Sequence, residues 1–124
     1  MRALVVDDSR AMRMIVARLL QKVGFEICFA EHGQAALQVL ESEPAFDVAL
    51  VDWNMPVMTG IEFVAAVRAD HRWDAMRIMM VTTETEQEHV LRALEAGANE
   101  YLMKPFSPEG LVEKLAILGM PVAA

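Results

Sequence analysis

Five short apolar runs alternate with five amphipathic segments along this chain of 124 residues. The runs are rich in Val, Ile, Leu, Met and Phe, which is typical of parallel strands buried on both faces. They cover residues 3–6, 25–30, 46–51, 77–82 and 99–103. Strict alternation of strand and helix predicts right-handed crossovers, with helices on both faces of one parallel sheet.

The segments between the runs carry apolar residues at helical spacing, so each helix is expected to bury one stripe against the sheet. The stripes comprise Met12, Ile15, Val16, Leu19 and Leu20; Ala36, Val39 and Leu40; Ile61, Val64 and Val67; Val90, Leu91 and Leu94; and Leu111, Leu115 and Leu118. Gly119 and Pro121 are expected to end the last helix. The predicted fold class is α/β, a doubly wound five-stranded parallel sheet of the flavodoxin-like (βα)5 kind, with residues 1–124 in a single domain.

Charge and cysteine content exclude several classes of protein. The formal net charge of −7 argues against a nucleic-acid surface, because phosphate backbones need clustered Lys and Arg. The lone Cys28 permits no internal disulfide and no leader precedes the first run, so a cytoplasmic location is expected. No apolar stretch approaches the roughly 20 residues of a membrane helix. We therefore expect no nucleic acid and no membrane among the partners.

An acidic pair, Asp7 and Asp8, directly follows the first run, where the chain must turn into a helix. Adjacent carboxylates repel each other unless a cation or hydrogen bonds offset their charge. Mg²⁺ prefers oxygen ligands and keeps several waters, so two or three protein oxygens are enough to bind it. Taken alone, Asp8 fits helix capping better, in which Asp8 or Ser9 accepts hydrogen bonds from first-turn amides.

Asp52 follows the third run and precedes a segment that must leave the strand, because Pro56 disfavours helix at Met55. A carboxylate at a strand end can attack phosphorus when a metal and a cation offset the charge of the transferring group. Taken alone, the residue fits an Asx turn equally well. Trp53 should then lie near the mouth of the site.

Lys104, after the fifth run, has no apolar reason for its position and is predicted to point at the same site. Its ammonium group would lower the pKa of the Asp52 carboxyl and later pair with phosphoryl oxygens. The alternative is a solvated lysine. Thr82, at the end of the fourth run, has a hydroxyl that can donate to a phosphoryl oxygen, whereas Thr83 is explained by β-propensity alone. Because ligands bind at the carboxyl ends of parallel strands, these side chains are expected to share one pocket.

Three motifs give the chain a wider resemblance: VDWNMP at residues 51–56, MTG at 58–60 and KPF at 104–106. Over essentially its whole length the chain resembles the receiver domains of two-component response regulators, most of all the small single-domain chemotaxis regulators of the CheY-like kind. The resemblance implies that Asp52 accepts a phosphoryl group from a histidine kinase. It further implies that Mg²⁺ is held by Asp7, Asp8, Asp52 and the backbone carbonyl of Asn54.

The resemblance also implies how the signal leaves the site. Lys104 and Thr82 would contact the phosphoryl group, and Thr82 and Tyr101 would form a switch. Their movement would remodel the face made by the fourth helix, fifth strand and fifth helix, where a downstream target protein would dock. The resemblance places Asn54 and Glu84 at positions that modulate dephosphorylation. A monomer is expected.

Three classes of function remain. The first is a phosphorylation-switched signalling protein, which is not an enzyme beyond catalysing its own phosphorylation and slow dephosphorylation. The second is a phosphatase of the haloacid-dehalogenase type, which would need a second aspartate at position 54, where Asn54 stands. The third is a scaffold that binds partners without phosphorylation. The chain has room for no output domain, unless the receiver is cut from a longer regulator.

The histidines and the cysteine are assigned no function. His32, His71 and His89 lack metal-ligand spacing and are expected to be exposed. Cys28, inside the second run, is expected to be a small core residue.

Overall fold

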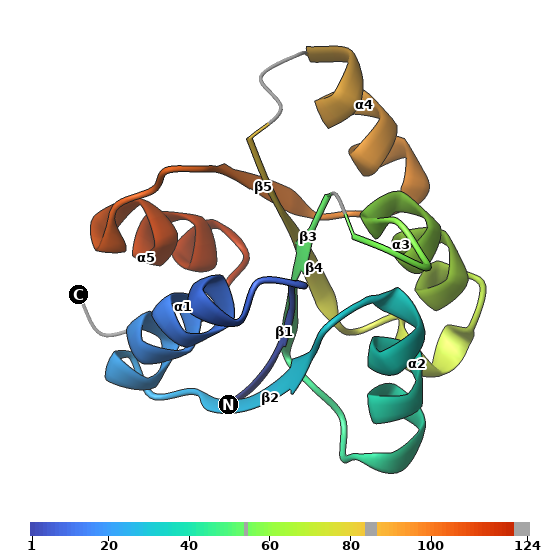
Figure 1. Ribbon diagram of the computed structural model, residues 1–124, viewed down its shortest axis with the longest axis horizontal. Helices are drawn as coiled ribbons and strands as arrows, with labels where there is room; N and C mark the ends of the chain where they lie inside the picture. The colour runs from blue at the N-terminus through green and yellow to red at the C-terminus, as the bar shows by residue number, and fades with distance from the viewer. Residues whose placement is uncertain (54, 84–86, 121–124) are drawn as a thin grey trace.

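The computed structural model describes residues 1–53, 55–83 and 87–120, and in them five strands alternate with five α-helices (Figure 1). The strands are β1 (Arg2–Val6), β2 (Glu26–Ala30), β3 (Val48–Asp52), β4 (Arg77–Thr82) and β5 (Glu100–Met103). The helices are α1 (Arg10–Lys22), α2 (Gly33–Ser42), α3 (Gly60–Arg68), α4 (Gln87–Ala96) and α5 (Pro108–Ile117), with a short 3₁₀ helix η1 (His71–Trp73) after α3.

All five strands pair in parallel in the order β2-β1-β3-β4-β5. Val6 of β1 lies opposite Val51 of β3, and Asp52 lies opposite Val81 of β4. The carboxyl ends of the three inner strands therefore meet at one edge of the sheet. The predicted flavodoxin-like fold is confirmed.

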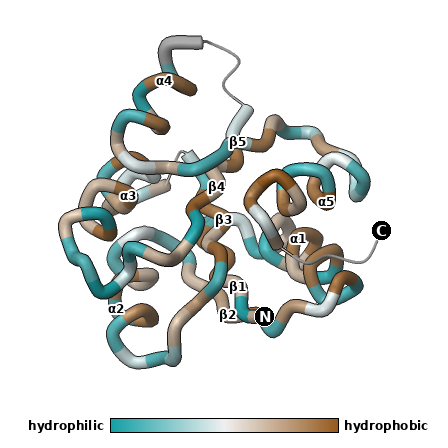
Figure 2. Tube along the Cα trace, turned by 180° about the vertical axis from the view of Figure 1, so that it is seen from behind, coloured by the Kyte–Doolittle hydropathy of each residue, from teal (hydrophilic) through white to brown (hydrophobic). Residues whose placement is uncertain are grey.

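Helices cover both faces of the sheet, with α1 and α5 on one side and α2, α3 and α4 on the other (Figure 1). Alternate residues of the inner strands serve the two layers: Val5, Leu50 and Met79 pack towards α1 and α5, while Val51 and Met80 pack towards the other three helices. Seen from behind, the helices alternate between hydrophobic and hydrophilic stretches (Figure 2). The molecule therefore has two hydrophobic cores, one on each face of the sheet.

The prediction that each helix buries its apolar stripe against the sheet was wrong for some residues of α1 and α4. Leu91 and Leu94 of α4 are 50% and 41% exposed, and among the side chains of α4 that the structure describes the buried one is Ala93. Ile15 of α1 is likewise exposed. Helical spacing identifies apolar residues that share a face, but it does not say what covers that face. The outward side of α4 consequently carries two exposed leucines beside the exposed charges of Arg92 and Glu95.

Strand β2 also departs from the expectation of burial on both faces. It forms one edge of the sheet, and Phe29 is exposed. Cys28 is only partly buried, and its thiol donates to Glu43 Oε1 at 3.5 Å. Burial and that hydrogen bond raise the pKa of the Cys28 thiol.

Among the helices of the described residues, none has the length and apolar character needed to cross a membrane.

Candidate functional site

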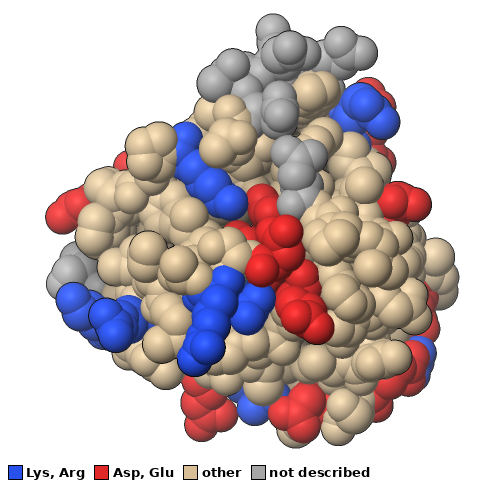
Figure 3. Space-filling model, in the orientation of Figure 1, with Lys and Arg blue, Asp and Glu red and all other residues tan. Residues whose placement is uncertain are grey.

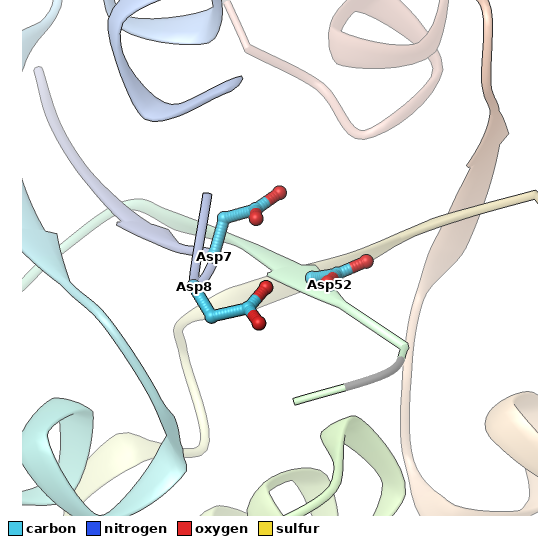
Figure 4. Close-up of side chains that lie close together, drawn as sticks. All are labelled: Asp7, Asp8 and Asp52. Carbon is cyan, nitrogen blue, oxygen red and sulfur yellow. The ribbon is translucent and has the colours of Figure 1, made fainter. Parts of the chain in front are cut away.

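Three aspartates gather at the carboxyl edge of the sheet (Figure 4). Asp7 and Asp8 follow β1, Asp52 is the last residue of β3, and their carboxylate oxygens lie within 4.8 Å of one another. Asp7 and Asp52 are only 4% and 8% exposed, whereas Asp8 is open to solvent. The site is therefore a shallow acidic pocket with Asp8 at its mouth.

The turn from β1 into α1 is fixed by hydrogen bonds on Asp7 and Ser9. Asp7 Oδ1 accepts from the Ser9 amide at 2.9 Å, and the Asp7 carbonyl accepts from the guanidinium of Arg13 at 2.7 Å. Ser9 is the N-cap of α1, since its side chain accepts from the Met12 amide at 3.2 Å. The N-cap is therefore Ser9 and not Asp8. Helix capping does not explain the carboxylate at position 8.

Lys104 reaches the same pocket from the end of β5. Its Nζ lies 3.1 Å from Asp52 Oδ1 and 3.4 Å from Asp7 Oδ2, and its side chain is only 16% exposed. The Lys104 amide donates to the Thr82 carbonyl at 2.8 Å, and the Lys104–Pro105 bond is cis. The lysine is therefore an internal ion-pair partner and not a solvated side chain.

The electrostatics of Asp52 differ from the expectation in one respect. Burial raises the pKa of its carboxyl above the ordinary value, and the neighbouring Asp7 carboxylate raises this pKa further. Lys104 lowers the pKa of Asp52, as predicted, but it does not outweigh the other two effects. One ammonium group is too little positive charge for three carboxylates, so the donor set of hard oxygens fits an added divalent cation.

The other predicted residues that the structure describes, Thr82 and Tyr101, belong to β4 and β5. Thr82 is buried at the end of β4, and Thr83 is exposed. Tyr101 of β5 packs partly buried against the core beneath α3 and α4, and Lys114 Nζ lies 4.6 Å from the centroid of its ring. Glu100 Oε1 accepts from Lys114 Nζ at 3.2 Å. Asn54 and Glu84 lie outside the described residues.

Sequence reasoning missed two histidine contacts. His89 of α4 was expected to be exposed, but it is partly buried and stacks on Trp53, with ring centroids 5.3 Å apart and an interplanar angle of 23°. His32 is the N-cap of α2, and its Nδ1 accepts from the Ala35 amide at 3.1 Å. Its position directly before a helical run was a usable signal for the cap. His71 is exposed as predicted.

The surface around the pocket is mixed in charge. The space-filling view, in the orientation of Figure 1, shows an acidic patch near the middle of the face, with Lys and Arg side chains close by (Figure 3). Negative charge concentrated at the carboxyl edge of a parallel sheet is suited to a cation and, with it, a phosphoryl group.

The fold and this pocket together define a phosphoryl-accepting receiver. The chain belongs to the response regulator receiver domain family, whose model matches residues 3–116. Membership implies a histidine kinase as phosphodonor. Such a receiver is not a conventional enzyme, since its typical chemistry is its own phosphorylation and dephosphorylation.

The chain is similar to three chemotaxis proteins over nearly its full length. It is 44% identical to chemotaxis protein CheY1 of Helicobacter pylori over 119 residues, covering 95% of this chain and 96% of that protein. It is 46% identical to the CheY homolog of Campylobacter jejuni over 116 residues, 93% of this chain and 89% of that one. The structure of CheY4 from Vibrio cholerae matches with a TM-score of 0.88 and 42% identity, covering 94% and 97% of the two chains.

Proposed function

We propose that this chain is a phosphorylation-switched signalling protein of a chemotaxis pathway, in which Asp52 receives the phosphoryl group. The observation that carries the proposal is the geometry of Asp52, a buried carboxylate that ends β3 beside two other aspartates and 3.1 Å from Lys104 Nζ. The names of the similar proteins support the pathway. The proposal includes a single receiver domain that acts as a monomer in the cytoplasm.

In the proposed reaction a carboxylate oxygen of Asp52 attacks the phosphorus of a phosphohistidine in the kinase. The phosphorus–nitrogen bond breaks, its electron pair returns to the imidazole nitrogen, and that nitrogen takes up a proton. Lys104 already lies between Asp7 and Asp52, so its ammonium can pair with the incoming phosphoryl oxygens without a large movement. The Thr82 hydroxyl, at the end of the next strand, donates to another oxygen.

The proposed metal is Mg²⁺. The carboxylates of Asp7, Asp8 and Asp52 would hold it, together with the backbone carbonyl of Asn54. When bound, Mg²⁺ supplies positive charge that offsets the negative charge of the carboxylates and the phosphoryl oxygens. Burial and, after it, the neighbouring Asp7 carboxylate raise the pKa of Asp52, and a bound cation would favour the ionised carboxylate against both effects.

The proposed output is a change in the face formed by α4, β5 and α5. Movement of Thr82 towards the phosphoryl group would open space that Tyr101 fills, which biases a pair of conformations rather than creating a new fold. Leu91 and Leu94 give α4 an exposed apolar surface beside this switch, which suits the docking of a target protein.

The test of the acceptor is incubation with acetyl phosphate and Mg²⁺, followed by intact-mass measurement. The unsubstituted protein should gain one phosphoryl group, and Asp52→Asn should gain none. Asp74→Asn, a change to an aspartate of the exposed surface, is the matched control and should label normally. Equal labelling of Asp52→Asn would remove Asp52 from the role.

The test of the switch uses Thr82→Ala. This variant should be phosphorylated at a similar level, because Asp52 and Lys104 are unchanged, but it should lose most of the phosphorylation-dependent gain in binding to a target. Binding that is equally tight with and without phosphorylation, in the unsubstituted protein, would instead support a phosphorylation-independent scaffold.

A further inference from the structure

The ring pair of Trp53 and His89 joins the phosphoacceptor strand to α4. Trp53 directly follows Asp52, His89 is in the first turn of α4, and the two rings are stacked 5.3 Å apart between centroids. Both side chains are partly buried, and Trp53 also packs against the core beneath α2, α3 and α4.

The backbone of Trp53 is held firmly on both sides. Its amide donates to the Val81 carbonyl at 3.1 Å, and its carbonyl accepts from the Gly60 amide at 3.1 Å. Gly60 is pressed so close that an added Cβ would lie 2.5 Å from the Asp52 carbonyl and 3.2 Å from Trp53 Cα. The backbone beside Asp52 is therefore constrained by hydrogen bonds and close packing on both sides of Trp53.

Space for a reorientation of the rings exists beside the pair. A hollow of about 230 Å³ lies between the start of α3 and the outer side of α4. It is lined by Trp53, Thr59, Ile61, Glu62, His89 and Arg92. Either ring can turn into this hollow without first displacing a packed core side chain.

Helix α4 is anchored at its other end. The Gly97 carbonyl, just after α4, accepts from Arg68 Nε at 3.0 Å, and the Ala98 amide donates to the Ala93 carbonyl at 3.0 Å. The same Arg68 side chain binds the Trp73 and Met76 carbonyls, at 3.0 and 2.7 Å. With its carboxyl end fixed, α4 can respond at its amino end, where His89 meets Trp53.

We propose that the Trp53–His89 pair is a second link between the phosphoryl site and α4, in which His89 is a positioning residue that acts through Trp53. The inference rests on the proposed function, since it takes Asp52 as the acceptor. Coupling between two sites is reciprocal, so a partner that shifts α4 also shifts the Trp53 ring and, through it, the affinity of the pocket for the phosphoryl group.

The test compares His89→Leu, which fills space without an aromatic ring, with His89→Phe, which keeps the stack. The probe is beryllium fluoride with Mg²⁺, which takes the place of a phosphoryl group on a carboxylate, and the readout is the NMR shift of the amides of residues 89–96. His89→Leu should reduce this response without abolishing it, because the Thr82 route remains. His89→Phe should restore it.

A second readout does not depend on phosphorylation. In a Trp73→Phe background Trp53 is the sole tryptophan, because the chain has two. Its emission should change in His89→Leu and stay closer to the parent in His89→Phe. Thermal unfolding identifies any variant whose loss of response comes from misfolding.

The outcomes separate the two proposals. A full α4 response in a folded His89→Leu protein overturns the link alone, and so does a loss of response that His89→Phe fails to restore. No response in the unsubstituted protein, together with no labelling by acetyl phosphate, overturns the proposed function and the link with it.

Discussion

Asp52 owes its properties to the residues packed around it. It is buried at the end of a central strand. One carboxylate oxygen from each of Asp7, Asp8 and Asp52 lies within 4.8 Å of the other two. The raised pKa of its carboxyl means that folding opposes its ionisation. A buried carboxyl whose pKa is raised in this way is typical of a functional site, because an aspartate in this position does not stabilise the fold.

Replacement of Asp52 by asparagine should stabilise the protein without metal. At neutral pH the change removes a buried carboxylate that is repelled by Asp7, so the midpoint of thermal unfolding should rise by a few degrees. The measurement is thermal unfolding by circular dichroism in the presence of a chelator, at a series of pH values. Asp74→Asn serves as the control for loss of a surface charge.

The pH dependence of that gain follows from the direction of the pKa shift. Below the unfolded-state pKa, about 4 for an aspartate, the carboxyl is protonated in both states and adds no penalty. The penalty develops as pH rises through the higher pKa of the folded state and is complete above it. The gain in Asp52→Asn should therefore shrink as pH falls, and a gain that grew at low pH would contradict the assignment.

At the scale of elements, Arg68 ties α3 to η1, β4 and the turn after α4. Its guanidinium donates to the Gly97, Trp73 and Met76 carbonyls and to Asn99 Oδ1, at 2.7 to 3.0 Å. Arg68→Met leaves these acceptors without their donor and should lower the free energy of unfolding by about 2–4 kcal/mol. Urea titration measures this loss. Arg18→Met, on the exposed side of α1, should change it little.

Lys114 of α5 connects that helix to Tyr101, the proposed switch residue. Its ammonium lies over the ring of Tyr101 and pairs with Glu100, but the side chain is about a quarter exposed, so its loss should cost at most about 1 kcal/mol of stability. The sharper readout is the environment of Tyr101. Because the chain has one tyrosine, fluorotyrosine labelling gives a single ¹⁹F resonance. That resonance should shift or broaden in Lys114→Met and remain unchanged in Lys22→Met.

The elements were predictable from sequence, whereas the way each helix faces was less so. The run at 77–82 coincides with β4, because Ile78 to Val81 are apolar and buried, as a strand covered on both faces requires. In α4 the spacing of Leu91 and Leu94 correctly indicated a helix, but the sheet side is taken by Ala93. A small residue that allows close packing leaves no hydrophobic signal of its own, so the rotation of the helix could not be read from periodicity.

At the scale of the whole molecule, metal binding and folding should be linked. A ligand that binds only the folded state stabilises it by RT ln(1 + [L]/Kd), or about 2.7 kcal/mol at one hundred times Kd. Adding Mg²⁺ should therefore raise the unfolding midpoint in a concentration-dependent way. Asp8→Asn should need more Mg²⁺ for the same rise and for the same quenching of Trp53 emission. Equal Mg²⁺ dependence in both proteins would exclude Asp8 from the site.

The convergence of the site was predictable because topology alone produces it. Asp7 and Lys104 each follow a strand and Asp52 ends one, and parallel strands bring their carboxyl ends to one edge. His89 and Lys114 were not found, because their contacts with Trp53 and Tyr101 depend on helix placement. Arg13 was missed for the same reason, since its bond to the Asp7 carbonyl needs the first turn of α1 in place. Functional residues at strand ends can therefore be predicted from the sequence more readily than the helix residues that contact them.

The position of β3 in the sheet has a consequence for how rigidity is distributed. Asp52 ends a strand that is paired on both sides and buried throughout, while Tyr101 belongs to an edge strand and α4 exposes Leu91 and Leu94 to solvent. Amides of β3 should therefore exchange with deuterium only when the whole domain unfolds, and those of α4 and β5 through local opening. The proposed phosphorylation of Asp52 thus falls on a strand expected to open only on global unfolding. Its proposed effects fall on α4 and β5, where local opening should need less free energy.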